Sequence, residues 1–251
     1  MPNYVRNIVK MEGIVKLPLF TVEDGKTRFD FNKVIPMPDS LDIESGSITD
    51  EAIIYYVTDK CTLPLRAIGK TDRELVEKKI NNRFSKGSWA EEIFMRVLER
   101  THSASDIKKE ELYKKGEIYV SNIRKYGHAT WYEWRYENWG TKWNAGSNEQ
   151  EDDDTIIFET AWSNPEPVML KLSAMYPDAT IEHWWADEDM GCNDGYRIYR
   201  GGHIVEGDYY DSCSNEAYEV YVKCWGESDC LYQDEKGFWQ RRDCEACRRC
   251  Y

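Results

Sequence analysis

Residues 131–146 have the sequence WYEWRYENWGTKWNAG, which gathers four tryptophans and two tyrosines in one short segment. Trp131, Trp134 and Asn138 are spaced three and four residues apart, so a helix places them along one stripe. Gly140 then suits a helix end or a position with positive φ. Because an indole ring fills volume and its N–H needs a partner, the segment is predicted to organise the core. The alternative is a contact surface.

Segments on either side of this tract alternate apolar and polar residues, as β-strands do. Strands are expected at about residues 4–11, 29–35, 155–162, 180–186 and 196–205, with the last two paired around a turn at 191–195. Pro36 and Pro38 end the second strand in a rigid turn. A helix is expected after Pro165, with Ser163 or Asn164 as its cap. From the residues alone, this succession supports an α+β fold.

Between the second and third strands the pattern changes to helical spacing. Helix starts are indicated at Thr49, at the capping box formed by Thr71 and Glu74, at Ser88 and at Ser105. Residues 47–115 hold 14 Lys+Arg and 12 Asp+Glu, so the region is rich in basic groups but close to neutral. It is predicted to be an insertion of three or four helices, at about residues 45–117.

Composition favours a soluble globular protein. The chain has 251 residues, which is long enough to bury a sizeable core. Of these residues 31% are charged and 14% are aromatic, a composition that argues against wholesale disorder. It has no apolar run near the roughly 18–20 residues that a membrane helix needs. The opening MPNY lacks the basic and apolar regions of a signal peptide. A cytoplasmic location, in a host cell, is expected.

Charge is distributed unevenly along the chain. Residues 1–125 hold 22 Lys+Arg and 20 Asp+Glu, a net charge of +2, whereas residues 126–251 hold 11 and 26, a net charge of −15. Such an acidic half repels a phosphate backbone and favours a basic partner, including a protein whose cationic groove binds nucleic acid. The alternative is that the acidic residues serve solubility alone.

Seven of the eight cysteines follow residue 190, and the last five have the spacing C-x5-C-x13-C-x2-C-x2-C. Cys224, Cys230, Cys244 and Cys247 are therefore candidates to bind one zinc ion, and Cys250 could replace one of them. Only the C-x2-C half has the usual zinc spacing. Reduced thiols in a reducing cytosol, or disulfides under oxidising conditions, are the alternatives.

Other candidate sites have weaker support. His183 and His203 fall on strands expected to pair, and Cys192-Asn193-Asp194 with His203 could imitate a nucleophile, an orienting group and a base. The run Glu151-Asp152-Asp153-Asp154 could bind a divalent cation, but such runs usually form a solvated loop. Glycine-rich phosphate motifs are absent. The sequence thus presents no convincing active site, and an enzyme is not expected.

Four segments together resemble a known family. They are MPNYVRN (1–7), FDFNKVIPMPDSL (29–41), YENWGTKWNA (136–145) and TAWSNPEPVMLKLSAMYPDA (160–179). In this order they are similar to the YubB-type ferredoxin-like proteins of phages, plasmids and other bacterial mobile elements. The resemblance covers about residues 1–40 and 118–206. The resemblance implies a ferredoxin-like fold and an origin in a phage or mobile element. It implies no catalytic activity, because none is established for the family.

Together these features predict a ferredoxin-like α+β domain with an antiparallel sheet at 1–206, the helical insertion at 45–117 and a cysteine-rich extension at 207–251. The expected function is non-enzymatic: a phage or mobile-element protein that uses an acidic surface to inhibit a host defence effector such as a nuclease, in the manner of an anti-CRISPR protein. The candidate binding residues are Trp131, Trp134, Trp139, Trp143, Glu151, Asp152, Asp153 and Asp154. One alternative is a single-stranded nucleic-acid-binding module that uses sheet aromatics and the basic residues of the insertion. Another is a hydrolase or nuclease with a metal site in the tail.

Overall fold

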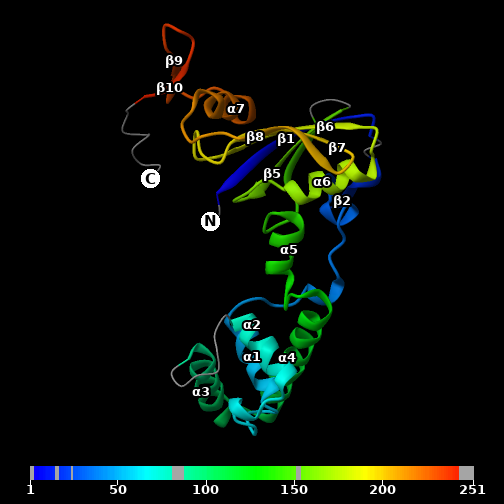
Figure 1. Ribbon diagram of the computed structural model, residues 1–251, viewed down its shortest axis with the longest axis vertical. Helices are drawn as coiled ribbons and strands as arrows, with labels where there is room; N and C mark the ends of the chain where they lie inside the picture. The colour runs from blue at the N-terminus through cyan, green and yellow to red at the C-terminus, as the bar shows by residue number, and fades with distance from the viewer. Residues whose placement is uncertain (1–2, 15–16, 24, 81–87, 151–153, 243–251) are drawn as a thin grey trace. The chain divides into compact units, whose positions relative to one another are not determined.

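The computed structural model describes residues 3–14, 17–23, 25–80, 88–150 and 154–242. The chain divides into two compact units (Figure 1). The sheet unit comprises Met1–Pro36 and Arg135–Tyr251, and the helical unit comprises Met37–Trp134. None of the helices within the described ranges is both long and apolar enough to cross a membrane.

A six-stranded antiparallel sheet forms the centre of the sheet unit, with the strand order β4–β5–β1–β6–β7–β8. The strands are β1 (Tyr4–Glu12), β4 (Gly146–Gln150), β5 (Thr155–Ala161), β6 (Thr180–Asp187), β7 (Gly195–Arg200) and β8 (His203–Tyr209). In the central strand β1, Ile8 lies opposite Ile157 on one side and Trp184 on the other. The predicted α+β class with a ferredoxin-like antiparallel sheet is confirmed.

The predicted strand at residues 29–35 is wrong. The hairpin β2 (Phe20–Glu23) and β3 (Lys26–Phe29) forms a separate two-stranded sheet between the short helices η1 (Leu17–Leu19) and η2 (Phe31–Lys33). At Asp30 the chain turns, because the carboxylate accepts the backbone N–H of Asn32 at 2.9 Å. Phe29 and Phe31 are both fully buried. The alternation that suggested a strand therefore comes from a strand end followed by a helical turn.

Residues 196–205, predicted as one strand, form parts of two. β7 ends at Arg200, and β8 runs back beside it from His203. Gly201 and Gly202 connect them with φ values of +57° and +84°, which residues with a Cβ rarely adopt. Strand β4 was not predicted, because GSNEQ has neither apolar alternation nor β-branched residues.

Two helices cover opposite faces of this sheet (Figure 1). The helix predicted after Pro165 is confirmed as α6 (Glu166–Met175). On the other face, α7 (Asn215–Trp225) begins after Ser214, whose hydroxyl accepts the N–H of Ala217. The contact between α7 and the sheet is apolar: Val220 and Cys224 of α7 pack on Ile8 and Ala186 of the strands. The predicted domain boundary at residue 206 thus lies within β8, ahead of a helix that packs on the sheet.

The helical unit contains the helices predicted for the insertion. They are α1 (Ser47–Val57), α2 (Lys70–Ile80), α3 (Trp89–His102) and α4 (Asp106–Tyr126), with short helices η3 (Asp39–Leu41) and η4 (Leu65–Ala67). Ser88 and Ser105 cap α3 and α4 as expected, by accepting the backbone N–H of Glu91 and Lys108. Helix α4 crosses α1 at Gly116, where a Cβ would lie 2.1 Å from the carbonyl oxygen of Ala52.

The tryptophan tract forms the predicted helix as α5 (Trp131–Trp139), and the boundary between the two units falls within it. After α7 comes a hairpin of β9 (Leu231–Gln233) and β10 (Trp239–Arg241), whose turn contains Glu235-Lys236-Gly237. Glu151, Asp152 and Asp153 lie outside the described residues. Cys244, Cys247 and Cys250 do so as well.

Candidate functional site

The structure divides the predicted tryptophan surface between core and exterior. Trp134 and Trp139 are 7% and 0% exposed, as predicted, whereas Trp131 is only partly buried. The indole N–H of Trp139 donates to the carbonyl oxygen of Ile35 at 2.9 Å, and its ring meets Phe31 edge-on at 5.7 Å. Trp134 and Trp139 are therefore core residues, and they are not accessible to a partner.

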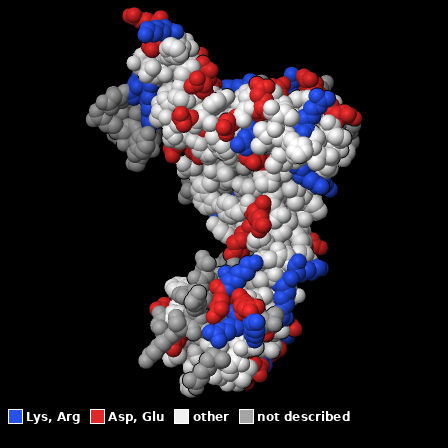
Figure 2. All heavy atoms as spheres, in the orientation of Figure 1, with Lys and Arg blue, Asp and Glu red and all other residues white. Residues whose placement is uncertain are grey.

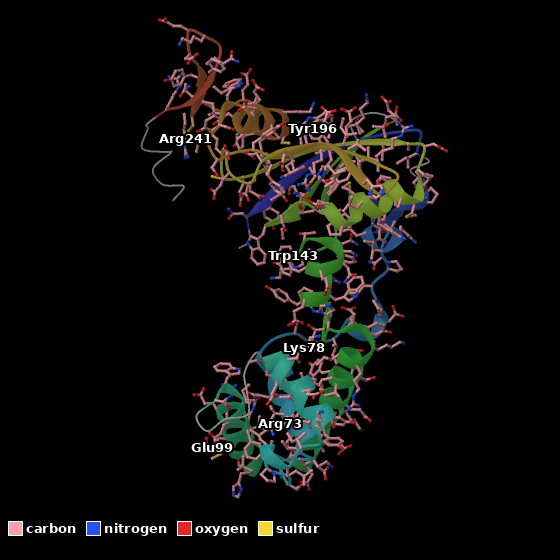
Figure 3. The ribbon with its side chains drawn as sticks, in the orientation of Figure 1. Arg73, Lys78, Glu99, Trp143, Tyr196 and Arg241 are labelled. Atoms are coloured by element: carbon pink, nitrogen blue, oxygen red, sulfur yellow. The ribbon has the colours of Figure 1, made fainter. Side chains whose placement is uncertain are left out.

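Trp143 belongs to a different environment, because α5 ends at Trp139 and Gly140 follows with φ +79°. The ammonium of Lys142 lies 5.0 Å from the centre of the Trp143 ring and 4.9 Å from that of Trp162. Tyr136 stacks on Trp162 with 6.3 Å between ring centres and 13° between planes. Tyr136, Lys142, Trp143 and Trp162 are called the lysine–aromatic cluster below. Figure 3 marks Trp143 in the loop beside α5.

Trp162 was missed as a site residue, because the TIIFETAW pattern placed it at the end of a strand. The structure ends β5 at Ala161 and gives Trp162 a φ of +65° with 41% of its surface exposed. The Trp162 N–H donates to the carbonyl oxygen of Asn3, and its own carbonyl accepts the amide of Asn193, both at 3.0 Å. A bulky residue in the left-handed region is a rare, strained conformation that is often found at functional positions.

Besides the lysine–aromatic cluster, the sheet itself offers a candidate surface. Helix α7 covers only part of one face of the sheet, and the part that it leaves uncovered is called the open sheet face. Strand pairing puts Lys10, Glu12, Glu182, Trp184, Tyr196, Ile198 and Glu206 on this face. Trp184 and Tyr196 stack at its centre, with ring centres 4.9 Å apart. The Tyr196 hydroxyl donates to Glu182 at 3.0 Å, and Glu206 is exposed on the edge strand. Both carboxylates and lysines lie around the stacked rings: Lys10 pairs with Glu12 at 2.7 Å, and the Lys223 ammonium of α7 lies 4.1 Å from the centre of the Trp184 ring. Figure 3 marks Tyr196 on the same face as α7.

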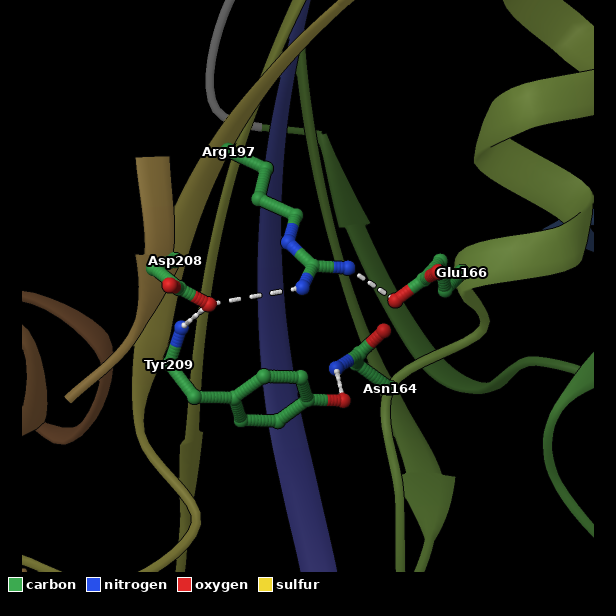
Figure 4. A network of polar contacts seen from close by, with 5 residues as sticks. All are labelled: Asn164, Glu166, Arg197, Asp208 and Tyr209. Atoms are coloured by element: carbon green, nitrogen blue, oxygen red, sulfur yellow. Dashed lines mark hydrogen bonds and ion pairs between the residues drawn. The ribbon is translucent and has the colours of Figure 1, made fainter. Parts of the chain in front are cut away.

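Beneath α6, on the opposite face, lies a buried polar network (Figure 4). The Arg197 guanidinium forms ion pairs with Glu166 at the start of α6 and with Asp208 on β8. Beside it, the Asn164 amide donates to the Tyr209 hydroxyl at 2.7 Å. The network joins α6 to the edge of the sheet. The Arg197 side chain is only 12% exposed, whereas the Asp208 side chain is 82% exposed and Tyr209 is 46% exposed, so the network ties a buried guanidinium to groups at the surface.

The predicted catalytic candidates are not brought together. Cys192 precedes β7 and His203 begins β8, at opposite ends of the β7–β8 hairpin. Burial raises the pKa of the Cys192 thiol, which disfavours the nucleophilic thiolate. Full burial lowers the pKa of His183 to about 3, with the charge of Arg197 adding to the effect, so this imidazole stays neutral. Its Nε2 lies 2.9 Å from the amide oxygen of Asn7, as in a packed core histidine.

Two cysteines of the predicted zinc site lie within the described residues. Cys224 is 5% exposed in the apolar cluster under α7, and burial raises the pKa of its thiol. Cys230 is partly buried between α7 and β9. Within the described ranges, no group of three or more His, Cys, Asp or Glu side chains is arranged to hold a metal ion.

The helical unit has a cleft of about 520 Å³ where α3 ends and α4 begins. Its lining includes the cations Arg100, Lys108, Lys109 and Lys115 and the carboxylate Glu111. Three of these cations are already paired: Arg100 with Glu51, Lys109 with Asp106, and Lys115 with Glu44. Figure 2 shows Lys and Arg gathered over the helices of this unit with acidic residues among them.

Comparisons with known proteins give one match that is confined to the sheet unit. A family model described as the ferredoxin-like domain in Api92-like protein matches residues 138–227. The chain is also similar to the uncharacterized protein YubB of Escherichia coli (strain K12), at 30% identity over 81 residues, which cover 30% of this chain and 54% of YubB. The chain thus spans about half the length of that relative. The resemblance to YubB-type ferredoxin-like proteins is confirmed.

Among solved structures, the crystal structure of a protein api92 from Yersinia pseudotuberculosis is similar at 13% identity. The alignment covers 84% of this chain and 99% of that one, with a TM-score of 0.36. A TM-score this low supports no conclusion about shared function.

Proposed function

We propose that this chain, in which residues 138–227 match the ferredoxin-like domain in Api92-like protein, acts by binding a basic partner protein rather than by catalysis. The open sheet face is the observation that carries this proposal. It combines stacked Trp184 and Tyr196 with surrounding carboxylates, and interfaces commonly have an aromatic centre and a polar rim. The Asp and Glu excess of residues 126–251 adds long-range attraction for a cationic partner.

The proposed partner is a host defence effector such as a nuclease, and the chain would inhibit it. A nuclease must hold nucleic acid in a positively charged groove, and carboxylates on a protein surface can occupy such a groove in place of phosphates. Association of this kind weakens steeply with salt, because both partners release counterions. The resemblance to YubB-type proteins, for which a phage or mobile-element context is expected from the sequence, motivates this choice of partner.

Charge reversal on the open sheet face tests the proposal. Proteins captured from host lysate by the wild-type chain are identified, and each purified basic candidate is titrated with the wild type and with Glu182→Lys/Glu206→Lys. We expect the double variant to bind at least ten-fold more weakly and to lose inhibition of the candidate's nuclease activity. Asp178→Lys, at an exposed position outside this face, serves as the matched control and should behave as the wild type. Equal binding by all three proteins would contradict the proposal.

The basic cleft of the helical unit supports a second candidate, binding of single-stranded nucleic acid. Lys108 and Lys109 line that cleft at the start of α4, where helix N–H groups also favour phosphate. This candidate ranks lower because most of the lining cations are paired with carboxylates. Fluorescence anisotropy with a labelled oligothymidine distinguishes it. Binding that Lys108→Glu/Lys109→Glu abolishes would favour the nucleic-acid function, and no binding at low salt would exclude it.

A further inference from the structure

The lysine–aromatic cluster has the arrangement of a cation-binding site. One ammonium group, that of Lys142, lies within 5.0 Å of two indole ring centres, Trp143 and Trp162. Cation–π attraction is significant within about 6 Å of a ring centre, and tryptophan is the strongest of the aromatic partners. Sites that recognise ammonium groups combine several aromatic faces around one cation in this way. The cluster differs from them because its cation belongs to the same chain.

The position of Trp162 is maintained at a conformational cost. Its backbone has φ +65°, and its ring is nevertheless 41% exposed rather than packed in the core. Backbone hydrogen bonding to Asn3 and side-chain hydrogen bonding from Asn193 hold this conformation, while Tyr136 stacks against the ring. Burial in the core does not explain the strained backbone of Trp162, because its ring is partly exposed. The strained conformation instead presents one face of the indole at the surface.

Carboxylates adjoin the same site. The Asn193 amide that contacts Trp162 also contacts Asp187, at 3.3 Å. Asn3 donates to both Asp187 and Asp189, at 3.2 Å and 3.0 Å. The two asparagines thus connect Trp162 to a pair of carboxylates, and Glu188 between them is exposed. Asp187 is only 6% exposed and accepts from both asparagines, so the accessible negative charge beside the Trp162 backbone is that of the exposed Glu188.

We propose that the lysine–aromatic cluster binds an arginine side chain of a basic partner protein, and that Lys142 occupies the site in the unbound protein. Guanidinium suits it better than ammonium, because it is planar, more weakly hydrated and stacks on aromatic faces. The Lys142 side chain has four methylene groups joined by rotatable bonds, so its ammonium group can move away from the two indole rings without movement of the backbone. The inference rests on the proposed function only for the basic character of the partner, since the site shares no residue with the open sheet face.

The test uses the full chain and a small probe, Nα-acetylarginine amide, with the shifts of the tryptophan indole N–H resonances as the readout. Lys142→Gln removes the internal competitor, so we expect it to bind the probe at least three-fold more tightly than the wild type. Trp162→Leu should weaken binding at least ten-fold, and Trp162→Tyr should restore part of it. Trp89→Leu, an exposed tryptophan on α3, is the matched control and should change nothing.

Two results would overturn the inference. One is that Lys142→Gln binds the probe no more tightly than the wild type. The other is that the uncharged analogue Nα-acetylcitrulline amide binds as well as the arginine probe. The outcome is independent of the open sheet face, because Glu182→Lys/Glu206→Lys should bind the probe normally. Failure of that double variant with the partner protein, together with normal probe binding, would separate the two proposals.

Discussion

Replacing Asp194 with asparagine should reverse a pH-dependent loss of stability. Asp194 is 1% exposed, and neither carboxylate oxygen has a hydrogen-bond partner among the described residues. Burial raises the pKa of this carboxyl from 3.8 to about 8; a weak backbone interaction with Asp187 opposes the rise, and the charge of Asp187 adds to it. At neutral pH the folded protein therefore holds the acid in its protonated form, which asparagine imitates in shape and in lack of charge.

The magnitude follows from linkage between protonation and folding. Above pH 3.8 the unfolded chain releases this proton, while the folded chain retains it until about pH 8. The free energy of unfolding therefore falls as pH rises through this window, and it levels off above the folded pKa. A shift of about four units at 1.36 kcal/mol each gives roughly 5 kcal/mol as an upper figure. Water entering the site would reduce it to about 2–4 kcal/mol.

Urea unfolding at pH 5, 7 and 9, followed by near-ultraviolet circular dichroism, measures the effect. Relative to the wild type, Asp194→Asn should gain about 0.5–2.5 kcal/mol more stability at pH 9 than at pH 5, because roughly 1.6 kcal/mol of the whole effect is already lost between pH 3.8 and pH 5. Asp178→Asn, at an exposed carboxyl, is the control and should keep the wild-type pH dependence. If Asp194→Asn has the same pH dependence as the wild type, the buried acid does not titrate as argued. If it is less stable at every pH, the carboxylate is ionised and paired.

Three further substitutions test the packing. Gly116→Ala should destabilise the helical unit by about 2–3 kcal/mol or more in chemical denaturation, because its Cβ would lie 2.1 Å from the Ala52 oxygen; an unchanged midpoint would refute the close helix crossing. Trp139→Ala should cost about 3–5 kcal/mol in the same assay, since a fully buried ring is lost; a cost below about 1 kcal/mol would place this ring outside the core. Cys224→Ala should lower the melting temperature and leave the zinc-to-protein ratio unchanged, because the thiol lies in an apolar cluster; a ratio falling from one to zero would instead establish the site with Cys230, Cys244 and Cys247.

Elements with local signals were predictable from the sequence. Strand β5 is a run of β-branched and aromatic residues, and the caps at Ser88 and Ser105 act within three residues of themselves. The false strand at 29–35 arose from a non-local contact. The Asn144 side chain accepts the N–H of Phe31 and donates to Asp30, and it fixes the turn from far along the chain. Periodicity cannot report such a contact, because both phenylalanines would also be buried in a strand.

The difference between local signals and non-local contacts also explains which tryptophans of the tract were predicted correctly. Helical spacing groups Trp131 with Trp134, and it applies only as far as Trp139, where α5 ends. Beyond Gly140 no period relates one side chain to the next, so the sequence could not place the partly buried Trp143 in the lysine–aromatic cluster. Trp162, the second indole beside Lys142, belongs to a different segment of the chain. Its exposed position depends on a positive φ, which the strand-like sequence around it does not predict. Core positions of this chain therefore follow from periodicity, whereas both proposed binding surfaces arise where separate segments meet in the folded sheet unit.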